Sequence, residues 1–426
     1  MIVCLLILGD FLLVFRPQVN PIAERKLPAW LIGIAVASPG LFTFFILTSV
    51  PILLAAKGVS VGRISVIVAI ATSPGSWGLC LSPLLDILLS RRSYTYLLCA
   101  IAAICLVFAI LCISNLAFLS GILLVGFLSA EMCGRSIEAW TSEFLQDDQV
   151  AAVAGWKQVA RLAIGPTFGS IVVALIRSLP LAWTLLLLAA LFVLPLVTCF
   201  FFPPPLFRTV KSREMLRMFW RDLYKAIGSK RCRYGMLVYL LPVACFALNF
   251  APLGNSFHVS EKLVTIISGP LTAIASGIGA LIGIWVCHKI DSLWAYVLPA
   301  LLATIVTGGL IAGPKVLIFY MVGCFLYNLF QGISYTAYST LMFEIVGLKN
   351  PLAATQFTLL TSLSNVPIVL LGALNGFGYS RFGLNGMLAS DTLVTAMTGV
   401  LLLIFVDLSI KGNRRGAGRV DDIVAF

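Results

Sequence analysis

Two nine-residue stretches carry the same pattern, GRSIEAWTS at residues 134–142 and GISYTAYST at residues 332–340. Both fit G-x-S-x-x-A-[WY]-[ST]-[ST], and at the same offset, without a gap, Gln158 falls on Gln356. Weak internal sequence symmetry of this kind indicates a structural repeat. We therefore expect the chain to consist of two related halves.

Both stretches lie inside long apolar segments, and such segments dominate the chain. Of 426 residues, 60% are apolar and only 11% are charged, which excludes an ordinary soluble domain. A membrane-spanning helix needs about 20 predominantly apolar residues. The segments that meet this requirement are 30–55, 61–85, 94–113, 117–140, 150–176, 180–201, 234–255, 263–288, 292–312, 315–345, 351–378 and 390–410. The sequence predicts an all-α membrane protein with 12 transmembrane helices in two pseudo-symmetric halves of six.

The longest hydrophilic connection separates these halves and predicts the domain organisation. The parts are an N-terminal cytoplasmic or interfacial segment at 1–29, six-helix halves at 30–202 and 234–410, a basic linker at 203–233 and a tail at 411–426. In the linker, apolar residues follow a helical spacing from Leu216 to Ile227, and basic residues recur every four positions. This pattern predicts an amphipathic helix on the membrane surface, serving as a linker or, alternatively, as a regulatory calmodulin-like target.

The net charge of +12 follows from the predicted topology. When the N-terminus is placed in the cytoplasm, most Lys and Arg residues fall in cytoplasmic connections, as expected for a multi-pass membrane protein. Both termini are therefore predicted to be cytoplasmic. The basic surplus requires no nucleic-acid partner.

Several kinds of chemistry are excluded by residues that the chain lacks. It has no Gly-Lys dipeptide, so the phosphate-binding loop of an ATP-driven pump is impossible. The two histidines, His258 and His288, cannot form the H-E-x-x-H zinc motif, and the 11 cysteines show no ligand spacing. We expect no metal, no cofactor and no enzymatic activity.

Five ionisable residues lie inside two neighbouring predicted spans, where charge is costly and usually functional. Glu131, Arg135 and Glu138 are spaced by four and three, so they share one helix face. If the chain turns near residue 145, Lys157 and Arg161 return to the same depth, and three cations then face two carboxylates. One hypothesis is a salt-bridge scaffold. The other is a cationic cavity for an anionic substrate, bound by Arg161 and Lys157, with Glu131 and Glu138 as proton-coupling groups and Arg135 as a structural partner.

Further polar residues at membrane depth are candidates for the second half of a substrate site. Each also fits an ordinary hydrogen bond between helices. They are Asn328, Gln331, Tyr335 and Gln356, with Asn249, Tyr338, Thr361, Ser364 and Asn365 nearby in the predicted spans.

Charged residues after the second span form a candidate gate. Asp86 with Arg91 and Arg92 fits an acidic-basic latch at cytoplasmic helix ends, or ordinary positive-inside charge. The stretch GPTFG at 165–169 fits part of a drug-antiporter motif or a packing kink.

Four patches together resemble the AmpG-type muropeptide permeases, a branch of the major facilitator superfamily shared with acetyl-coenzyme A transporters. They are SPLLD at 82–86 followed by the Arg pair, EAW at 138–140, RL at 161–162 and ATQFTLLTSLS at 354–364. The resemblance implies proton-driven import (symport) of an anionic sugar-peptide across a bacterial inner membrane, by a monomer. Such permeases carry an acidic residue four positions before the acidic-Ala-Trp element, where this chain has Gly134.

Two alternative functions remain beside this one. A proton-coupled drug or metabolite antiporter would be favoured by Gly165-Pro166. A membrane sensor that keeps the fold without transport is the other.

Overall fold

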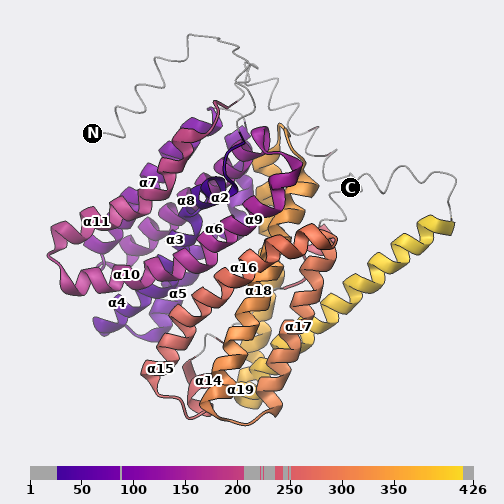
Figure 1. Ribbon diagram of the computed structural model, residues 1–426. Coiled ribbons are helices and arrows are strands. Elements are labelled where there is room, and N and C mark those ends of the chain that lie inside the picture. The colour runs from indigo at the N-terminus through magenta and orange to yellow at the C-terminus, as the bar shows by residue number, and fades with distance from the viewer. Residues whose placement is uncertain are drawn as a thin grey trace. The chain divides into compact units, whose positions relative to one another are not determined.

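The computed structural model describes residues 26–86, 89–205, 236–242 and 251–415, together with positions 221, 224 and 248. Every element in this part of the chain is helical, which confirms the all-α prediction (Figure 1). The start of the N-terminal segment, most of the 203–233 linker with its predicted amphipathic helix, and the end of the tail lie outside the described residues.

Within the described residues, 9 helices are long and apolar enough to cross a membrane. They are Ser38–Ala56, Arg91–Leu111, Leu116–Phe144, Asp147–Ser178, Leu181–Phe201, Ile267–Lys289, Ser292–Ala312, Leu317–Val346 and Ala353–Ile404. Most coincide with predicted spans to within a few residues.

The remaining predicted spans differ from the helices that the structure shows. Those at 351–378 and 390–410 both lie in α19 (Ala353–Arg415), whose backbone breaks at Gly383, where φ is 62° and ψ is −149°. The span at 61–85 divides after residue 72, at the Ser73-Pro74-Gly75 interruption, into the pieces α5 (Val61–Thr72), α6 (Pro74–Trp77), η2 (Gly78–Cys80) and η3 (Ser82–Asp86). The span at 234–255 is described only at residues 236–242, 248 and 251–255.

The chain forms two compact units, and each unit consists of two segments that are not consecutive in the sequence. Unit 1 comprises Met1–Lys225 and Gly347–Ser362, and unit 2 comprises Ala226–Val346 and Leu363–Phe426. The chain therefore leaves unit 2 after Val346, contributes one segment to unit 1, and returns to unit 2 at Leu363.

Unit 1 is built from the membrane helices of the first half. Besides α5 to η3, its elements are α2 (Ala29–Ala35), α3 (Ser38–Phe44), η1 (Phe45–Ser49), α4 (Val50–Ala56), α7 (Arg91–Leu111), α8 (Leu116–Phe144), η4 (Asp147–Gln149), α9 (Val150–Val159), η5 (Ala160–Ile164), α10 (Gly165–Ser178), α11 (Leu181–Val193) and η6 (Leu194–Phe201). Polar side chains start the two central helices. Ser90 accepts a hydrogen bond from the backbone of α7, and Asn115 does the same for α8.

Three membrane helices contain a π-helical turn, and each turn has a proline within it or within two residues of its end. The turns are η1, η5 and η8 (Ile267–Leu271), and the prolines are Pro51, Pro166 and Pro270. Proline has no backbone N–H and its ring crowds the carbonyl four residues earlier, so the helix widens locally instead of continuing regularly.

Glycines allow α3 to lie against the second of these turns. A Cβ atom on Gly40 would lie 2.9 Å from the Cα atom of Arg161, and one on Gly165 would lie 2.7 Å from the Phe44 ring. Ser49 also donates a hydrogen bond to the carbonyl of Gly169 at 2.8 Å. The GPTFG stretch therefore serves close helix packing, as one of its two sequence interpretations predicted.

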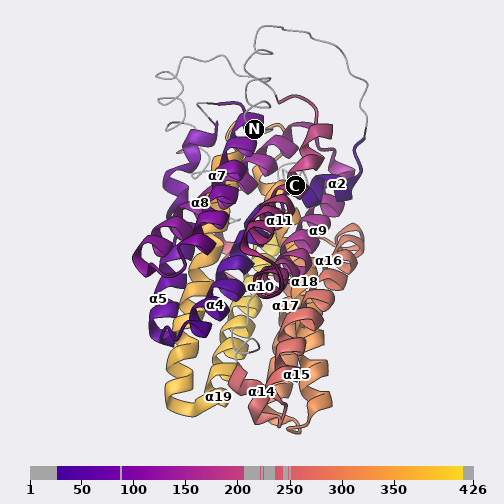
Figure 2. The same ribbon diagram turned by 90° about the vertical axis from the view of Figure 1, so that its left-hand side faces the viewer.

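Unit 2 contains α14 (Ala251–Ser256), α15 (Glu261–Ile266), η8, α16 (Thr272–Lys289), α17 (Ser292–Ala312), α18 (Leu317–Val346) and most of α19. The helices α16 and α17 both pack along α18. The two limbs of α19 meet in a turn at Gly383 (Figure 2). Gly378 and Gly386 bring the limbs into close contact, because a Cβ on Gly378 would lie 2.6 Å from the carbonyl oxygen of Gly386.

Candidate functional site

A chain of buried ion pairs joins α8 to α9 in unit 1. Arg135 binds Glu138 at 2.7 Å with one guanidinium nitrogen and Glu131 at 3.0 Å with the other. The Nζ atom of Lys157 pairs with the second carboxylate oxygen of Glu138. The helices turn back on each other through η4, as the expected hairpin requires, and this turn brings Lys157 beside Glu138.

The charges of the four residues joined by these ion pairs cancel one another. All four side chains are at most 10% exposed, and two cations balance two carboxylates. Partners held this tightly stabilise the charged forms of one another.

Arg161 carries the surplus positive charge predicted from the sequence. It lies in the π turn η5, one turn beyond Lys157, and is partly exposed. It forms no ion pair with any residue that the structure describes. Glu131 pairs with Arg135 on its own helix and not with Arg161. A guanidinium at membrane depth, beside a neutralised cluster, can receive an anionic group.

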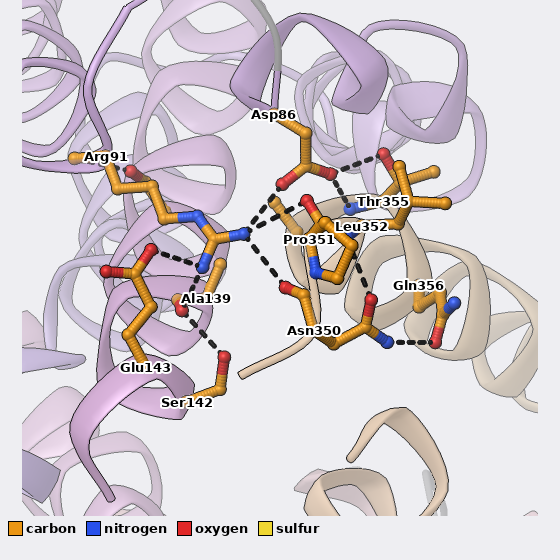
Figure 3. Close-up of polar contacts among 12 residues, drawn as sticks. Asp86, Arg91, Ala139, Ser142, Glu143, Asn350, Pro351, Leu352, Thr355 and Gln356 are labelled. Carbon is orange, nitrogen blue, oxygen red and sulfur yellow. Dashed lines mark hydrogen bonds and ion pairs between the residues drawn. The ribbon is translucent and has the colours of Figure 1, made fainter. Parts of the chain in front are cut away.

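A second polar cluster surrounds Arg91, which the sequence analysis placed in a loop and which is instead the first residue of α7 (Figure 3). One guanidinium nitrogen contacts Glu143 at 2.8 Å and donates to the carbonyl of Ala139 at 2.6 Å. The other contacts Asp86 at 3.2 Å and the carbonyls of Asn350 and Pro351, both at 3.2 Å. Arg91 therefore fastens the segment Gly347–Ser362 to the helices of unit 1.

The same segment has further hydrogen bonds to unit 1. Thr355 donates to Asp86 from its backbone nitrogen at 3.0 Å and from its hydroxyl at 2.8 Å. The backbone nitrogen of Lys349 donates to the carbonyl of Ser142 at 2.7 Å. Figure 3 shows the contacts of Arg91 and Asp86 converging on the short stretch that contains Asn350, Pro351 and Thr355. We call Asp86, Arg91, Glu143 and Gly347–Ser362 the latch.

Burial has an electrostatic consequence at Asp86. Loss of water raises the pKa of this carboxyl above its ordinary value, against the lowering effects of the Arg91 charge and of the hydrogen bonds from Thr355. Arg92, the predicted second basic partner, lies over the ring of Tyr96 at 5.9 Å, and the ion pair with Asp86 belongs to Arg91.

The polar residues predicted for the second half fall in different units. Gln356 lies in unit 1, where it accepts a hydrogen bond from Asn350 at 3.0 Å. Asn328, Gln331 and Tyr335 lie on α18 in unit 2. Asn328 donates to the carbonyl of Cys324 at 2.8 Å, whereas Gln331 and Tyr335 are partly exposed.

Glu143, Asn350 and Thr355, which make latch contacts, are absent from the site residues proposed from the sequence. Glu143 lies beyond the predicted end of its span, and Thr355 lies in the ATQ patch, which was noted only for its resemblance. Helical periodicity does not indicate Glu143, because it lies five residues beyond Glu138 and therefore on a different face of α8. The partnership of Thr355 with Asp86 has no local signal.

We expect Arg91→Lys to loosen the latch. A lysine cannot reproduce the forked contacts of the guanidinium, and hydrogen bonds to charged groups are worth about 1.5–3 kcal/mol each. Amide hydrogen exchange at Lys349 and Thr355, followed by mass spectrometry, should therefore accelerate by about 10- to 100-fold. Arg92→Lys is the matched control and should leave both amides slow. Unchanged exchange in Arg91→Lys would show that Arg91 does not hold this segment.

Comparison with known proteins gives the fold. No family model matches the chain, and no curated protein matches it in sequence. Among solved structures, a variant of the fucose:proton symporter of E. coli superposes with a TM-score of 0.65 at 13% identity, covering 89% of this chain and 99% of that one. A bacterial homologue of the iron transporter ferroportin, in an outward-facing state, gives a TM-score of 0.65 at 11% identity, covering 89% and 98%.

These neighbours and the long apolar helices define the class of protein. The chain is a multi-pass membrane protein with the fold of major facilitator superfamily transporters, as a further structure of the fucose symporter in an outward conformation also indicates, at a TM-score of 0.63.

Proposed function

We propose that this protein is a secondary transporter that imports an anionic solute across a bacterial inner membrane by alternating access, driven by protons. The observation that carries the proposal is Arg161, a cationic group that lies beside the buried ion pairs of α8 and α9 and forms no ion pair with a described residue. Four buried charges cancel each other, and Arg161 remains, partly exposed, on a π-helical turn. Turns of this kind are frequent at functional sites.

The proposed roles of the substrate residues follow from their chemistry. Arg161 receives a carboxylate of the solute through a two-pronged contact, and Lys157, one turn away, supports the substrate site by neutralising Glu138. Gln331 and Tyr335, which are partly exposed, with Asn328 and Gln356, supply hydrogen bonds for amide and hydroxyl groups.

The two carboxylates of the ion chain differ in their capacity to carry the coupled proton. Glu138 is bound by both Arg135 and Lys157, whereas Glu131 is bound by Arg135 alone at 3.0 Å. Glu131 therefore has one ion-pair contact to exchange, where Glu138 has two. We assign the coupling role to Glu131 and a supporting role to Glu138.

The latch is the proposed gate on the cytoplasmic side. Alternating access requires contacts that break and re-form, and the contacts of Arg91 with two backbone carbonyls of the segment Gly347–Ser362 suit this role. Both termini are cytoplasmic in this proposal.

The proposed solute is an anhydromuropeptide-like sugar-peptide. Support comes from the resemblance at 82–86, 138–140, 161–162 and 354–364, and from the cationic character of Arg161. A fold neighbour that is a fucose:proton symporter agrees with proton-driven import of a sugar-containing compound.

Uptake into proteoliposomes tests the proposal. Labelled anhydromuropeptide should accumulate when the outside is acidic and should only equilibrate when the gradient is collapsed. A non-acidic analogue that lacks the carboxylates is the control and should not accumulate. Expulsion of lipophilic cations would identify an antiporter, and binding without flux would identify a sensor.

A further inference from the structure

A buried acid-amide pair joins the two limbs of α19 in unit 2. Asn375 donates a hydrogen bond from its amide nitrogen to a carboxyl oxygen of Asp391 at 2.8 Å. Asn375 is 1% exposed and Asp391 is 3% exposed. Both residues lie eight positions from Gly383, which places the pair about 12 Å along each limb from the turn.

A carboxyl group in this position is costly. Ionisable residues within membrane helices are rare and usually bind or move an ion. Asp391 lies near the start of the predicted span 390–410. A charged residue is ordinary at the hydrophilic end of a membrane helix, so the sequence did not mark Asp391 as a buried acid.

The groups that face the pair come from the limbs themselves and from α17 and α18. On α17, which has no charged residue, the hydroxyl of Thr307 bonds that of Thr392 at 2.7 Å. The core cluster around Leu388, one turn from Asp391, contains the titratable side chains Tyr320, Cys324 and Tyr327 of α18.

Charged residues of the neighbouring elements lie toward helix ends. They are Glu344, which accepts from Ser292, Lys315, which binds the carbonyls of Leu310 and Ile311, and Arg381, which lies over the ring of Phe377.

Of the two polar atoms of the Asn375 side chain, the structure gives a hydrogen-bond partner only to the nitrogen. Its oxygen is buried and has no hydrogen-bond partner among the described residues. Buried polar atoms of this kind are uncommon and call for an explanation. An amide can donate to a carboxylate through its nitrogen and accept from a protonated carboxyl through its oxygen. The pair can therefore satisfy Asp391 in both protonation states.

We propose that Asp391 and Asn375 form a proton-binding site in unit 2, separate from the ion chain of α8 and α9. One proton adds to the carboxylate of Asp391 to give a neutral acid, whose O–H group then donates to the oxygen of Asn375. The site binds its proton without any solute, and only its use in coupling rests on the proposed function.

Infrared spectroscopy tests this directly on the full-length protein in lipid nanodiscs, without solute. With carbon-13 labelled aspartate, acidification should produce an isotope-shifted band of a protonated carboxyl in an apolar environment. The band should be absent in Asp391→Asn and should titrate at a shifted pH in Asn375→Leu, which removes the acceptor. Ser390→Ala, next to Asp391, is the control and should keep the band unchanged.

Two results would overturn the proposal. One is a wild-type protein that shows no such band at any pH where it stays folded, which needs no variant to fold. The other is a band whose titration depends on sodium and not on choline at constant ionic strength, because the site would then bind a metal cation.

The coupling role is tested separately. Asp391→Asn should keep solute exchange in proteoliposomes and lose gradient-driven accumulation. If wild-type protein accumulates no muropeptide, the proposed function fails while the infrared titration stands. If the titration is absent while accumulation persists, this site fails and the transporter stands.

Discussion

Replacement of Arg161 by lysine should reduce solute uptake by about 10- to 100-fold, because a charge-assisted two-pronged contact worth about 1.5–3 kcal/mol becomes a single contact. Folding should be unaffected, since Arg161 has no ion pair among the described residues. Initial uptake rates and thermal unfolding should be measured on the same purified protein.

The control for Arg161 is Arg177→Lys, an exposed arginine at the end of the same run of helix. It should keep normal uptake. A parallel loss of stability and uptake in Arg161→Lys would make Arg161 part of the scaffold and would remove the main support for an anionic solute.

The second large effect is expected at Arg135. Arg135→Met leaves Glu131 without its ion-pair partner and Glu138 with Lys157 alone. Removing one partner of a buried ion pair costs about 3–5 kcal/mol, because the remaining charge stays buried. The free energy of unfolding in detergent should fall by about this amount.

A variant that removes all four charges is the matched control for Arg135. Glu131→Gln, Arg135→Met, Glu138→Gln and Lys157→Met together leave no buried charge in the chain of ion pairs. Apolar or neutral replacement of a whole buried network is often tolerated. The combined variant should therefore be more stable than Arg135→Met alone, and the opposite order would contradict the described network.

Local spacing explains why the ion chain could be predicted from sequence. Residues three and four apart share a helix face, so the contacts of Arg135 with Glu131 and Glu138 follow from numbering alone. The hairpin through residues 147–149 then brings Lys157 back to Glu138. The prolines at 51, 166 and 270 were equally readable signals for the π turns, although the sequence analysis did not use them.

The latch could be predicted only in part, because its partners are far apart in the chain. Asp86 and Arg91 attracted attention as a charged pair, but nothing near them in sequence indicates Thr355 or Asn350. Gln356 was grouped with Asn328 and Tyr335 because all three are polar residues in neighbouring predicted spans, and the sequence has no local signal that Gln356 lies in unit 1.

Unit 1 includes a segment that is translated after much of unit 2, and this order has a consequence for biosynthesis. Unit 1 needs the segment Gly347–Ser362 to complete its contacts, and residues 226–346 must first be translated. At about 5–20 residues per second, the ribosome adds this stretch in a time on the order of 10 seconds. During that interval Asp86 and Arg91 lack their later partners on the growing chain. The first half must therefore remain incomplete in the membrane until α18 has been inserted, and a fragment ending at the central linker would lack the residues that close the latch.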